Sequence, residues 1–381
     1  MSEISLLYGK RFGSSRLFRE LQNGTSKRSA TLVSCPSVCG IIASNFMSSP
    51  TTSHESGEFP VTIDDIRAAH VRIAPRIHRT SVLTCSSLNE IAGAQLFFKC
   101  ENLQKTGSFK IRGATNAIFS LTDEQSKRGI AAPSSGNHAA AVAQAARWRG
   151  VPAYIVMPSN SSPAKMRAVE SYGGQITLCE PTIPSRESVT AAVLEKTGAH
   201  LVHPYNDARV IAGQGTAALE LLEEIPNLDA VIAPVSGGGL LSGTAIAAKA
   251  LRPGIGVIGA EPLNADDAFR SLASGRIEPV ATTQTIADGL RAQLCPLTFR
   301  IIRTLVDEIS LVSEQEIVGS MLQLWERMKL VVEPSGSVPA AAVLAQKPAL
   351  LHNKNGGEGP FAPRIGIILS GGNLDLKHLP F

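Results

Sequence analysis

From Val61 onward, the sequence alternates between short apolar runs and longer segments of helical period. The apolar runs have the length of buried strands, and they are Gln95–Lys99, Gly129–Ala132, Ala153–Met157, Gln175–Cys179, His200–His203, Ala230–Val235, Val257–Ala260 and Ile365–Leu369. The predicted helices between them are Ser108–Leu121, Asn137–Arg149, Ala164–Tyr172, Arg186–Lys196, Thr216–Glu224 and Leu240–Leu251. Repeated strand–helix units predict an α/β fold in which mostly parallel sheets are covered by helices on both faces. Ligands of such sheets bind in the loops that follow the carboxyl ends of the strands.

The formal charge of +4 is located in the first fifty residues, which hold six Lys or Arg, two acidic side chains and eleven Ser. A Ser- and Arg-rich, acid-poor segment has the composition of an organelle transit peptide, although a disordered extension or an error in gene prediction would look the same. We therefore expect a leader over residues 1–58. The protein would be cytoplasmic, or mitochondrial or plastid if the leader is a transit peptide. The neutral body argues against nucleic-acid polymers as partners, and no apolar run reaches the roughly 18–20 residues of a membrane span.

The first polar loop places Lys110 near the start of a predicted helix, with Ser108 as the candidate cap. A helix N-terminus is positive, so a partly desolvated lysine there has a lowered pKa. An amine of lowered pKa is a usable nucleophile. The alternative is an ordinary solvated surface lysine, so Lys110 needs support from the other loops.

The second polar loop, Ser134-Ser-Gly-Asn-His138, precedes an Ala-rich helix. Simple helix capping by Ser135 or Asn137 would explain these residues. The functional interpretation is a turn that presents two hydroxyls, an amide and an imidazole to a ligand.

The third loop, Ser236-Gly-Gly-Gly239, follows an apolar strand and precedes a helix. Backbone N–H groups of consecutive glycines converge on an anion, and the helix adds its dipole, so a phosphate is expected. The pattern is neither a Walker loop nor a dinucleotide fingerprint, and a flexible turn is the alternative. A fourth loop, Ser370-Gly-Gly-Asn373, offers a hydroxyl after the last predicted strand.

Together and in this order, the four motifs resemble the fold-type II pyridoxal-phosphate enzymes, and more closely the family of eukaryotic serine racemases and serine/threonine dehydratases. The resemblance covers about Ile63 to Leu376, with supporting stretches at His203–Asp207, Ile211–Thr216, Glu261–Asp267, Thr285–Gly289 and Val332–Gly336. It implies a fold like that of the tryptophan synthase β subunit, with two open, twisted, mostly parallel sheets flanked by helices. Residues 59–122 and 206–381 would form a large domain that binds pyridoxal phosphate, and residues 123–205 a small mobile domain.

The resemblance also implies the residues that bind the cofactor. Lys110 would bind pyridoxal phosphate covalently, Phe109 would pack beside it, and Asn137 would contact its ring hydroxyl. The backbone amides of the glycine loop would hold the phosphate, namely those of Ser236, Gly237, Gly238 and Gly239. Ser370 would donate a hydrogen bond to the pyridine nitrogen. A serine hydroxyl is too weak an acid to protonate that nitrogen, so the ring would be a weak electron sink, suited to elimination or rapid reprotonation.

By the same resemblance, Lys110 and Ser135 would be catalytic acid/base groups on opposite faces of the cofactor. Inversion at the substrate Cα requires two such groups, whereas dehydration requires removal of the Cα proton and loss of the β-hydroxyl. The substrate carboxylate would be bound by Ser134, Asn137, His138 and Arg186. Arg186 could instead be an exposed side chain at a helix start.

Glu261, Asp267 and the carbonyl of Ala265 match the divalent-cation site of the serine racemase group. Oxygen ligands completed by water suit Mg²⁺ or Ca²⁺. The alternative is a cluster of helix-capping carboxylates. The resemblance further implies that the protein forms a homodimer, and it suggests ATP as an allosteric activator.

The sequence thus leads to a hypothesis of a pyridoxal-phosphate enzyme that racemises L-serine to D-serine and also dehydrates serine to pyruvate and ammonia. The alternative is an ammonia-lyase for L-threonine, L-serine or 3-hydroxyaspartate with little racemisation. A third hypothesis is a catalytically silent sensor of pyridoxal phosphate or an amino acid, and the intact Lys110 and Ser135 argue against it.

Overall fold

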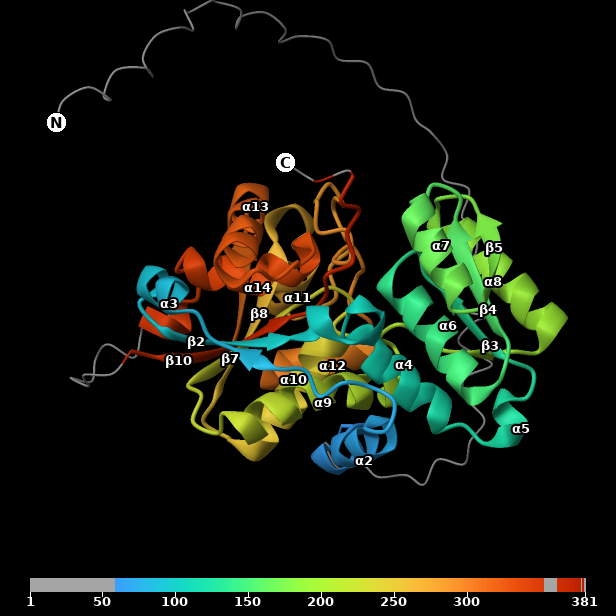
Figure 1. Cartoon of the computed structure of the whole chain (residues 1–381), viewed down its shortest axis with the longest axis horizontal. Coiled ribbons are helices and arrows are strands. Elements are labelled where there is room, and N and C mark those ends of the chain that lie inside the picture. Colours follow the sequence, from blue (N-terminus) through green and yellow to red (C-terminus); the bar gives the residue numbers. More distant parts are fainter. Residues whose placement is uncertain (1–58, 353–361, 378, 380–381) are drawn as a thin grey trace, which may run out of the picture. The chain divides into compact units, whose positions relative to one another are not determined.

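Two sheets organise the part of the chain that the computed structural model describes, which is residues 59–352, 362–377 and 379 (Figure 1). The six-stranded sheet has the order β1-β2-β10-β7-β8-β9, and within it only the edge strand β1 runs antiparallel to its neighbour. Its strands are β1 (Val82–Leu83), β2 (Gln95–Cys100), β7 (Ala230–Pro234), β8 (Gly256–Pro262), β9 (Glu308–Val312) and β10 (Arg364–Leu369). The four-stranded sheet is parallel, with the order β5-β4-β3-β6. Its strands are β3 (Ile130–Pro133), β4 (Ala153–Pro158), β5 (Gly174–Cys179) and β6 (His200–Leu201).

This architecture confirms the predicted α/β fold with two mostly parallel sheets flanked by helices. The eight predicted strands all form, and β1 and β9 were not predicted. The predicted leader, residues 1–58, lies outside the described residues.

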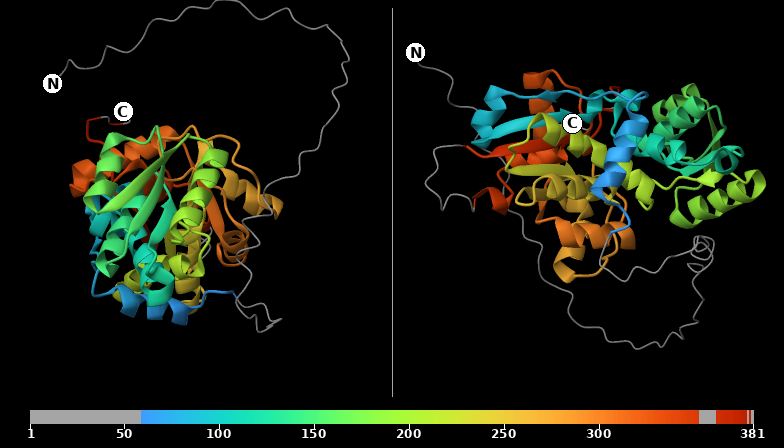
Figure 2. Two further views of the ribbon diagram at one scale, coloured as in Figure 1. Left: turned by 90° about the vertical axis from the view of Figure 1, so that its right-hand side faces the viewer. Right: turned by 90° about the horizontal axis from the view of Figure 1, so that it is seen from below.

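Helices pack on both faces of the six-stranded sheet (Figures 1 and 2). The α-helices are α2 (Ile63–Ile73), α3 (Ser86–Ala92), α4 (Lys110–Phe119), α5 (Asp123–Ser126), α6 (Asn137–Arg149), α7 (Pro163–Ser171), α8 (Ile183–Thr197), α9 (Ala208–Glu224), α10 (Gly239–Leu251), α11 (Asp267–Ser274), α12 (Pro296–Leu305), α13 (Glu314–Gln323), α14 (Pro334–Leu344) and α15 (Ala349–His352). Val231 and Ala233 of β7 pack with residues of α9, α10 and α12, whereas Ala230 and Ile232 pack with residues of α14. Because alternate strand residues point to opposite faces, β7 is buried on both sides.

Helix α4 connects the cores of the two sheets. Ile111 and Ile118 pack in one cluster with Ile130 of β3 and with residues of α6. On its other side α4 packs on α9, where a Cβ added to Gly213 would lie 2.6 Å from the Cα of Gly113. Neither glycine tolerates a side chain at this contact, so the crossing of the two helices depends on both.

Two helices begin three or more residues earlier than predicted. Helix α9 begins at Ala208 rather than at Thr216, with the side chain of Asp207 accepting a hydrogen bond from a backbone N–H at its start. Helix α8 begins at Ile183, where the side chain of Thr182 caps it and Arg186 falls within its first turn.

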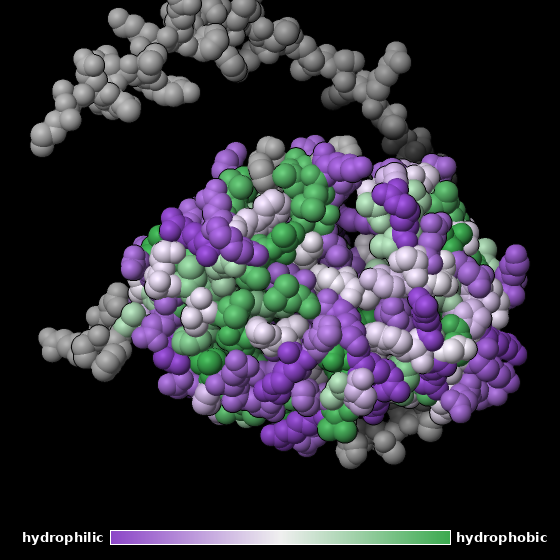
Figure 3. All heavy atoms as spheres, in the orientation of Figure 1, coloured by the Kyte–Doolittle hydropathy of each residue, from purple (hydrophilic) through white to green (hydrophobic). Residues whose placement is uncertain are grey.

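No helix in the described ranges is long and apolar enough to cross a membrane. On the face drawn in Figure 3, polar and apolar residues are interspersed.

Candidate active site

Lys110, the first residue of α4, is half-buried, and its amine has no counter-ion among the described residues. Its Nζ donates a hydrogen bond to the carbonyl of Pro204 over 3.3 Å and lies 5.0 Å from the ring centroid of Phe109. No carboxylate in the described part of the chain pairs with it, and burial lowers the pKa of the amine to about 8. The pKa of Lys110 is thus lowered, as predicted, and the cause is desolvation of the charged amine.

Ser108 does not cap α4, contrary to prediction. The N-cap residue is Phe109, which makes no capping bond through its side chain. Instead, the backbone of Ser108 bridges Gly371, and the N–H of Phe109 donates to the carbonyl of Ser370 over 3.0 Å. The buried Oγ of Ser108 has no hydrogen-bond partner among the described residues. This contact joins the Lys110 loop to the loop that follows β10.

The side chains of the Ser134–His138 loop do not cap α6, so the capping alternative for this loop is wrong. Gly136 is the N-cap residue, and no side chain caps the helix. Asn137 reaches across to two other loops: its Nδ2 donates to Oε1 of Glu333 over 2.7 Å, and its Oδ1 accepts from Nδ2 of Asn373 over 2.9 Å. The structure therefore brings the second and fourth polar loops together.

Glu333 is a buried acid at this junction whose place in the site was missed from the sequence. A Cβ added to Gly371 would lie 2.5 Å from its Oε1, so the carboxyl group lies directly against the loop after β10. Burial, followed by the charge of Asp288, raises the pKa of Glu333 to about 8. The available signal was Pro334, because an acid followed by proline is typical of a helix start, and Glu333 is the N-cap of α14.

His138 is held as a neutral imidazole. Its Nε2 lies 3.0 Å from the carbonyl of Val202, and because a carbonyl only accepts, Nε2 carries the proton. Burial and the charge of Lys110 lower the pKa of His138 to about 3. Its Nδ1 is therefore an acceptor, and it has no partner among the described residues. Burial, followed by the charge of Lys110, likewise lowers the pKa of His203 to about 4.

The glycine loop between β7 and α10 has a conformation that requires its glycines. Gly238 has a φ of +88°, and a Cβ added to Gly237 would lie 2.3 Å from the ring of Tyr205. No side chain caps the N-terminus of α10, which leaves its first N–H groups for an anion. Tyr205 follows Pro204, whose carbonyl binds Lys110, so a single short segment contacts both the glycine loop and the lysine.

The remaining predicted residues lie around these loops. Ser134 and Ser135 are half-buried, and Ser134 Oγ accepts from the N–H of Gly136 over 3.4 Å. Arg186 is half-buried, and its charge contributes to the lowered pKa of His203. Ser370 is buried directly after β10. Ser236 Oγ exchanges hydrogen bonds with the backbone of Ala292.

The predicted cation residues lie between β8 and α11. Oε1 of Glu261 accepts from the N–H of Ala268 over 3.0 Å and Oε2 accepts from that of Phe269 over 2.8 Å, so this carboxylate does cap the helix. The Oδ2 of Asp267 is buried without a partner among the described residues, and burial raises the pKa of Asp267 to about 6. Burial also raises the pKa of Glu261 well above its usual range. The described ranges hold no group of three His, Cys, Asp or Glu side chains suited to a metal, so a cation here would depend on the Ala265 carbonyl and on water.

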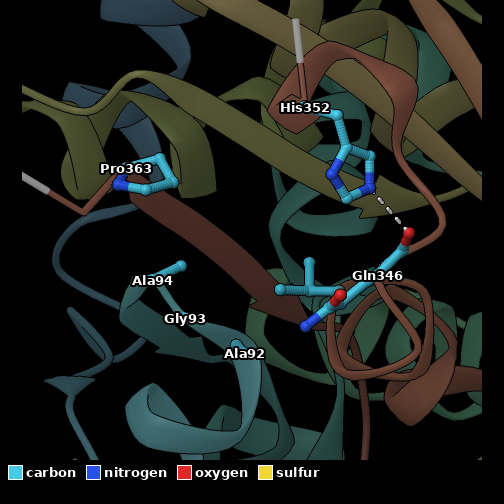
Figure 4. Close-up of a pocket in the computed structure, with 7 residues that line it drawn as sticks. Ala92, Gly93, Ala94, Gln346, His352 and Pro363 are labelled. Atoms are coloured by element: carbon cyan, nitrogen blue, oxygen red, sulfur yellow. Dashed lines mark hydrogen bonds between the residues drawn. The ribbon is translucent and has the colours of Figure 1, made fainter. Parts of the chain in front are cut away.

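A cavity of about 210 Å³ lies at the opposite ends of the strands (Figure 4). Its lining includes Ala94 and Pro363, which precede β2 and β10, whereas the polar loops follow the carboxyl ends of the strands. Figure 4 shows His352 at its edge, with Nε2 3.0 Å from the carbonyl of Gln346. The cavity is thus separate from the Lys110 site.

Comparison with known proteins agrees with this geometry. A sequence profile described as "Pyridoxal-phosphate dependent enzyme" matches residues 73–356. The chain belongs to this enzyme family. A serine racemase of Oryza sativa subsp. indica is 51% identical over 325 residues, which are 85% of this chain and 94% of that protein. A beta-hydroxyaspartate dehydratase of Paracoccus denitrificans is 48% identical over 320 residues, which are 84% of this chain and 98% of that protein. The solved structure of maize serine racemase has a TM-score of 0.80 and 49% identity, covering 84% of this chain and 95% of that one.

The architecture is accordingly that of a fold-type II pyridoxal-phosphate enzyme, and the residues of the site fit this cofactor. The half-buried amine of Lys110 has no counter-ion among the described residues and a lowered pKa, as suits a group that bonds to the aldehyde of the cofactor. The uncapped start of α10 and the glycine loop supply N–H groups for a phosphate. The Oγ of Ser108 adds a buried polar group that no atom of the described ranges satisfies.

Proposed function

We propose that this enzyme racemises L-serine to D-serine and also dehydrates serine to pyruvate and ammonia. The observation that carries the proposal is the unpaired, half-buried Lys110 amine, of pKa about 8, in a site with a loop whose serine hydroxyls are not used as helix caps. The 51% identity to a serine racemase over nearly the full length of that protein supports serine as the substrate.

Lys110 and Ser135 are the proposed acid/base groups. Pyridoxal phosphate, when bound, withdraws electrons from the substrate and makes its Cα proton acidic. An amine of pKa about 8 is partly deprotonated near neutral pH, so the Nζ of Lys110 takes or returns the Cα proton on one side. The Oγ of Ser135 does the same on the other side, and inversion therefore needs both groups. Dehydration needs the proton transfer at Lys110 and departure of the β-hydroxyl.

The cofactor is proposed to bind along the loops described above. The backbone amides of residues 236–239 hold its phosphate, where no side chain caps α10. Phe109 packs beside the ring, Asn137 contacts the ring hydroxyl, and Ser370 donates to the ring nitrogen.

Ser134, Asn137, His138 and Arg186 are proposed to bind the substrate. His138 has a particular role, because its Nε2 proton is already donated to Val202. Its Nδ1 can only accept, which suits a hydroxyl or ammonium group of the substrate better than the carboxylate. Arg186, whose charge reaches the site, is the candidate for the carboxylate.

The second candidate is a dehydratase of threonine, serine or 3-hydroxyaspartate that racemises little. It is favoured by the 48% identity to a beta-hydroxyaspartate dehydratase over 98% of that protein. Incubating the purified holoenzyme with L-serine, L-threonine and 3-hydroxyaspartate, and measuring D-isomers and 2-oxo acids separately, distinguishes the two. The racemase proposal expects D-serine together with pyruvate, whereas oxo acid without any D-serine leaves the dehydratase.

A divalent cation is proposed at Glu261, Asp267 and the Ala265 carbonyl. The buried Oδ2 of Asp267, which has no partner in the described part of the chain, supports it, and an oxygen-only set selects Mg²⁺ or Ca²⁺. Burial of the two carboxylates disfavours their charged forms and raises the pKa of both. A bound cation would offset this cost.

We also propose that residues 123–205, which contain the four-stranded sheet, form a small domain that moves against residues 59–122 and 206–381. A homodimer, activation by ATP, and a leader that is dispensable for the chemistry are further proposals that rest on the family resemblance. Light scattering with and without ATP, and activity of a chain that begins at residue 57, test them.

A further inference from the structure

Thr298 lies outside every motif discussed above, yet its hydroxyl group contacts the glycine loop. It is fully buried in the first turn of α12, where its Oγ1 lies within donating distance of two carbonyls, that of Gly237 at 2.9 Å and that of Cys295 at 3.2 Å, and the shorter contact is the one to Gly237. The same oxygen accepts from the N–H of Cys295 over 3.2 Å. The Thr298 hydroxyl therefore links the start of α12 to the loop before α10.

The segment before Thr298 makes a second connection to the same loop. Ser236 Oγ accepts from the N–H of Ala292 over 2.9 Å and donates to the Ala292 carbonyl over 3.1 Å. Two successive residues of the loop, Ser236 and Gly237, are thus fixed by groups of residues 292–298.

Packing confines the loop on both sides. A Cβ added to Gly238 would lie 2.8 Å from the Cβ of Thr298 and 2.8 Å from a methyl of Leu294. A Cβ added to Gly237 would lie 2.3 Å from the ring of Tyr205. A side chain at Gly237 would therefore collide with Tyr205, and one at Gly238 would collide with Leu294 and Thr298.

We propose that Thr298 is a positioning residue, which holds the glycine loop in the conformation that binds the cofactor phosphate. This inference rests on the proposed phosphate site at residues 236–239. A chain of glycines has many conformations in solution, and ordering it at the moment of binding would cost affinity. The Thr298 hydroxyl fixes the Gly237 peptide beforehand, so the N–H groups that follow are already directed to the anion.

The test compares Thr298→Val with Thr298→Ser in the full chain. Valine keeps the shape of threonine and removes the donor, whereas serine keeps the donor and removes a methyl group. Dissociation constants of pyridoxal phosphate and of pyridoxal, which lacks the phosphate, are measured by titrating each apoenzyme and following the visible absorbance. Thermal unfolding of the apoenzymes reports on the fold.

Thr298→Val is expected to bind pyridoxal phosphate roughly 10-fold more weakly, the scale of one lost hydrogen bond to a buried carbonyl, with pyridoxal binding unchanged. Thr298→Ser should bind both as the wild type does. Equal affinity of Thr298→Val and wild type for pyridoxal phosphate, or equal weakening for both ligands, would overturn the proposal. If the valine variant does not fold, Thr298→Cys replaces it, since a thiol is a weak donor of similar size. Wild-type protein that binds neither ligand would instead contradict the proposed function itself.

Discussion

Arg112 and Glu101 form a doubly hydrogen-bonded ion pair in which neither side chain is exposed to solvent. Nε of Arg112 donates to Oε2 of Glu101 over 2.7 Å and Nη2 donates to Oε1 over 2.8 Å. The same guanidinium donates to both oxygens of Glu220, which also accepts from Lys99 over 2.7 Å. Two cations and two carboxylates are thus paired in the core. One of the cations, Arg112, lies two residues after Lys110 in α4.

Removing Arg112 should destabilise the fold strongly. Arg112→Met leaves two buried carboxylates with one cation, and the expected loss of unfolding free energy is about 3–5 kcal/mol. Urea denaturation of the apoenzyme measures it. The matched control is Arg79→Met, which breaks an ion pair with Glu223 whose side chains are 48% and 45% exposed. This control should lose less than about 1 kcal/mol, and similar losses for both variants would contradict a special role of the buried pair.

Lys110→Ala should abolish attachment of the cofactor and with it the visible absorbance, whereas Lys105→Ala should keep both. In the wild type, the rate of attachment to the apoenzyme should rise with pH and level off above about pH 8, because only the neutral amine attacks and burial holds the Lys110 pKa at about 8. Stopped-flow absorbance over pH 6–10 gives this profile. A rate that continues to rise toward 10.5, the ordinary lysine value, would show that the amine is solvated when it reacts.

Glu333 should make the stability of the apoenzyme depend on pH. Its pKa of about 8 in the folded protein lies above the ordinary 4.5, so the folded chain holds a proton that the unfolded chain releases. Stability should therefore fall as pH rises from about 4.5 to 8, and Glu333→Gln should remove that part of the fall. Melting temperatures of both proteins across this range should diverge in favour of the variant at the alkaline end. Parallel curves would mean that Glu333 ionises freely.

A divalent cation should stabilise the wild type through Asp267. Millimolar Mg²⁺ or Ca²⁺ at pH 8 should raise the melting temperature, since a ligand of the folded state shifts the equilibrium toward it. At pH 5 the increase should shrink, because the Asp267 pKa of about 6 leaves that carboxyl protonated. Asp267→Asn should lose the response. The control is Asp266→Asn, which should keep the response because the carboxylate of Asp266 pairs with Arg270 over 2.8 Å and is not a proposed ligand. A response of Asp267→Asn equal to that of the wild type would exclude this site.

Periodicity predicted eight of the ten strands and six of the fourteen α-helices in the described residues, because buried parallel strands and amphipathic helices have distinct spacings. Periodicity failed to predict the start of α9, because Gly213 and Gly215 are typical of a break in a helix. Both are glycines because neighbouring backbone lies too close for a side chain, a tertiary cause that local propensity does not carry.

The polar loops could be found from sequence because they follow predicted strands and contain residues unusual in a core. The helix-capping roles expected of Ser108 and considered for Ser135 and Asn137 were wrong, since contacts between loops replace capping there. Glu333 lies in a stretch that supports the family resemblance, but neither it nor Thr298 was identified as a site residue, because each becomes significant only beside a loop distant in sequence.

The products that Ser135→Ala forms from L-serine test the central claim most directly. Wild-type holoenzyme should release D-serine and pyruvate, and their ratio is measured by chiral chromatography alongside a coupled pyruvate assay. If Ser135 supplies the second proton transfer at Cα, the variant should lose D-serine formation while retaining a measurable part of the dehydration of L-serine, with cofactor absorbance unchanged. An equal loss of both products, or D-serine formation at the wild-type rate, would contradict the account.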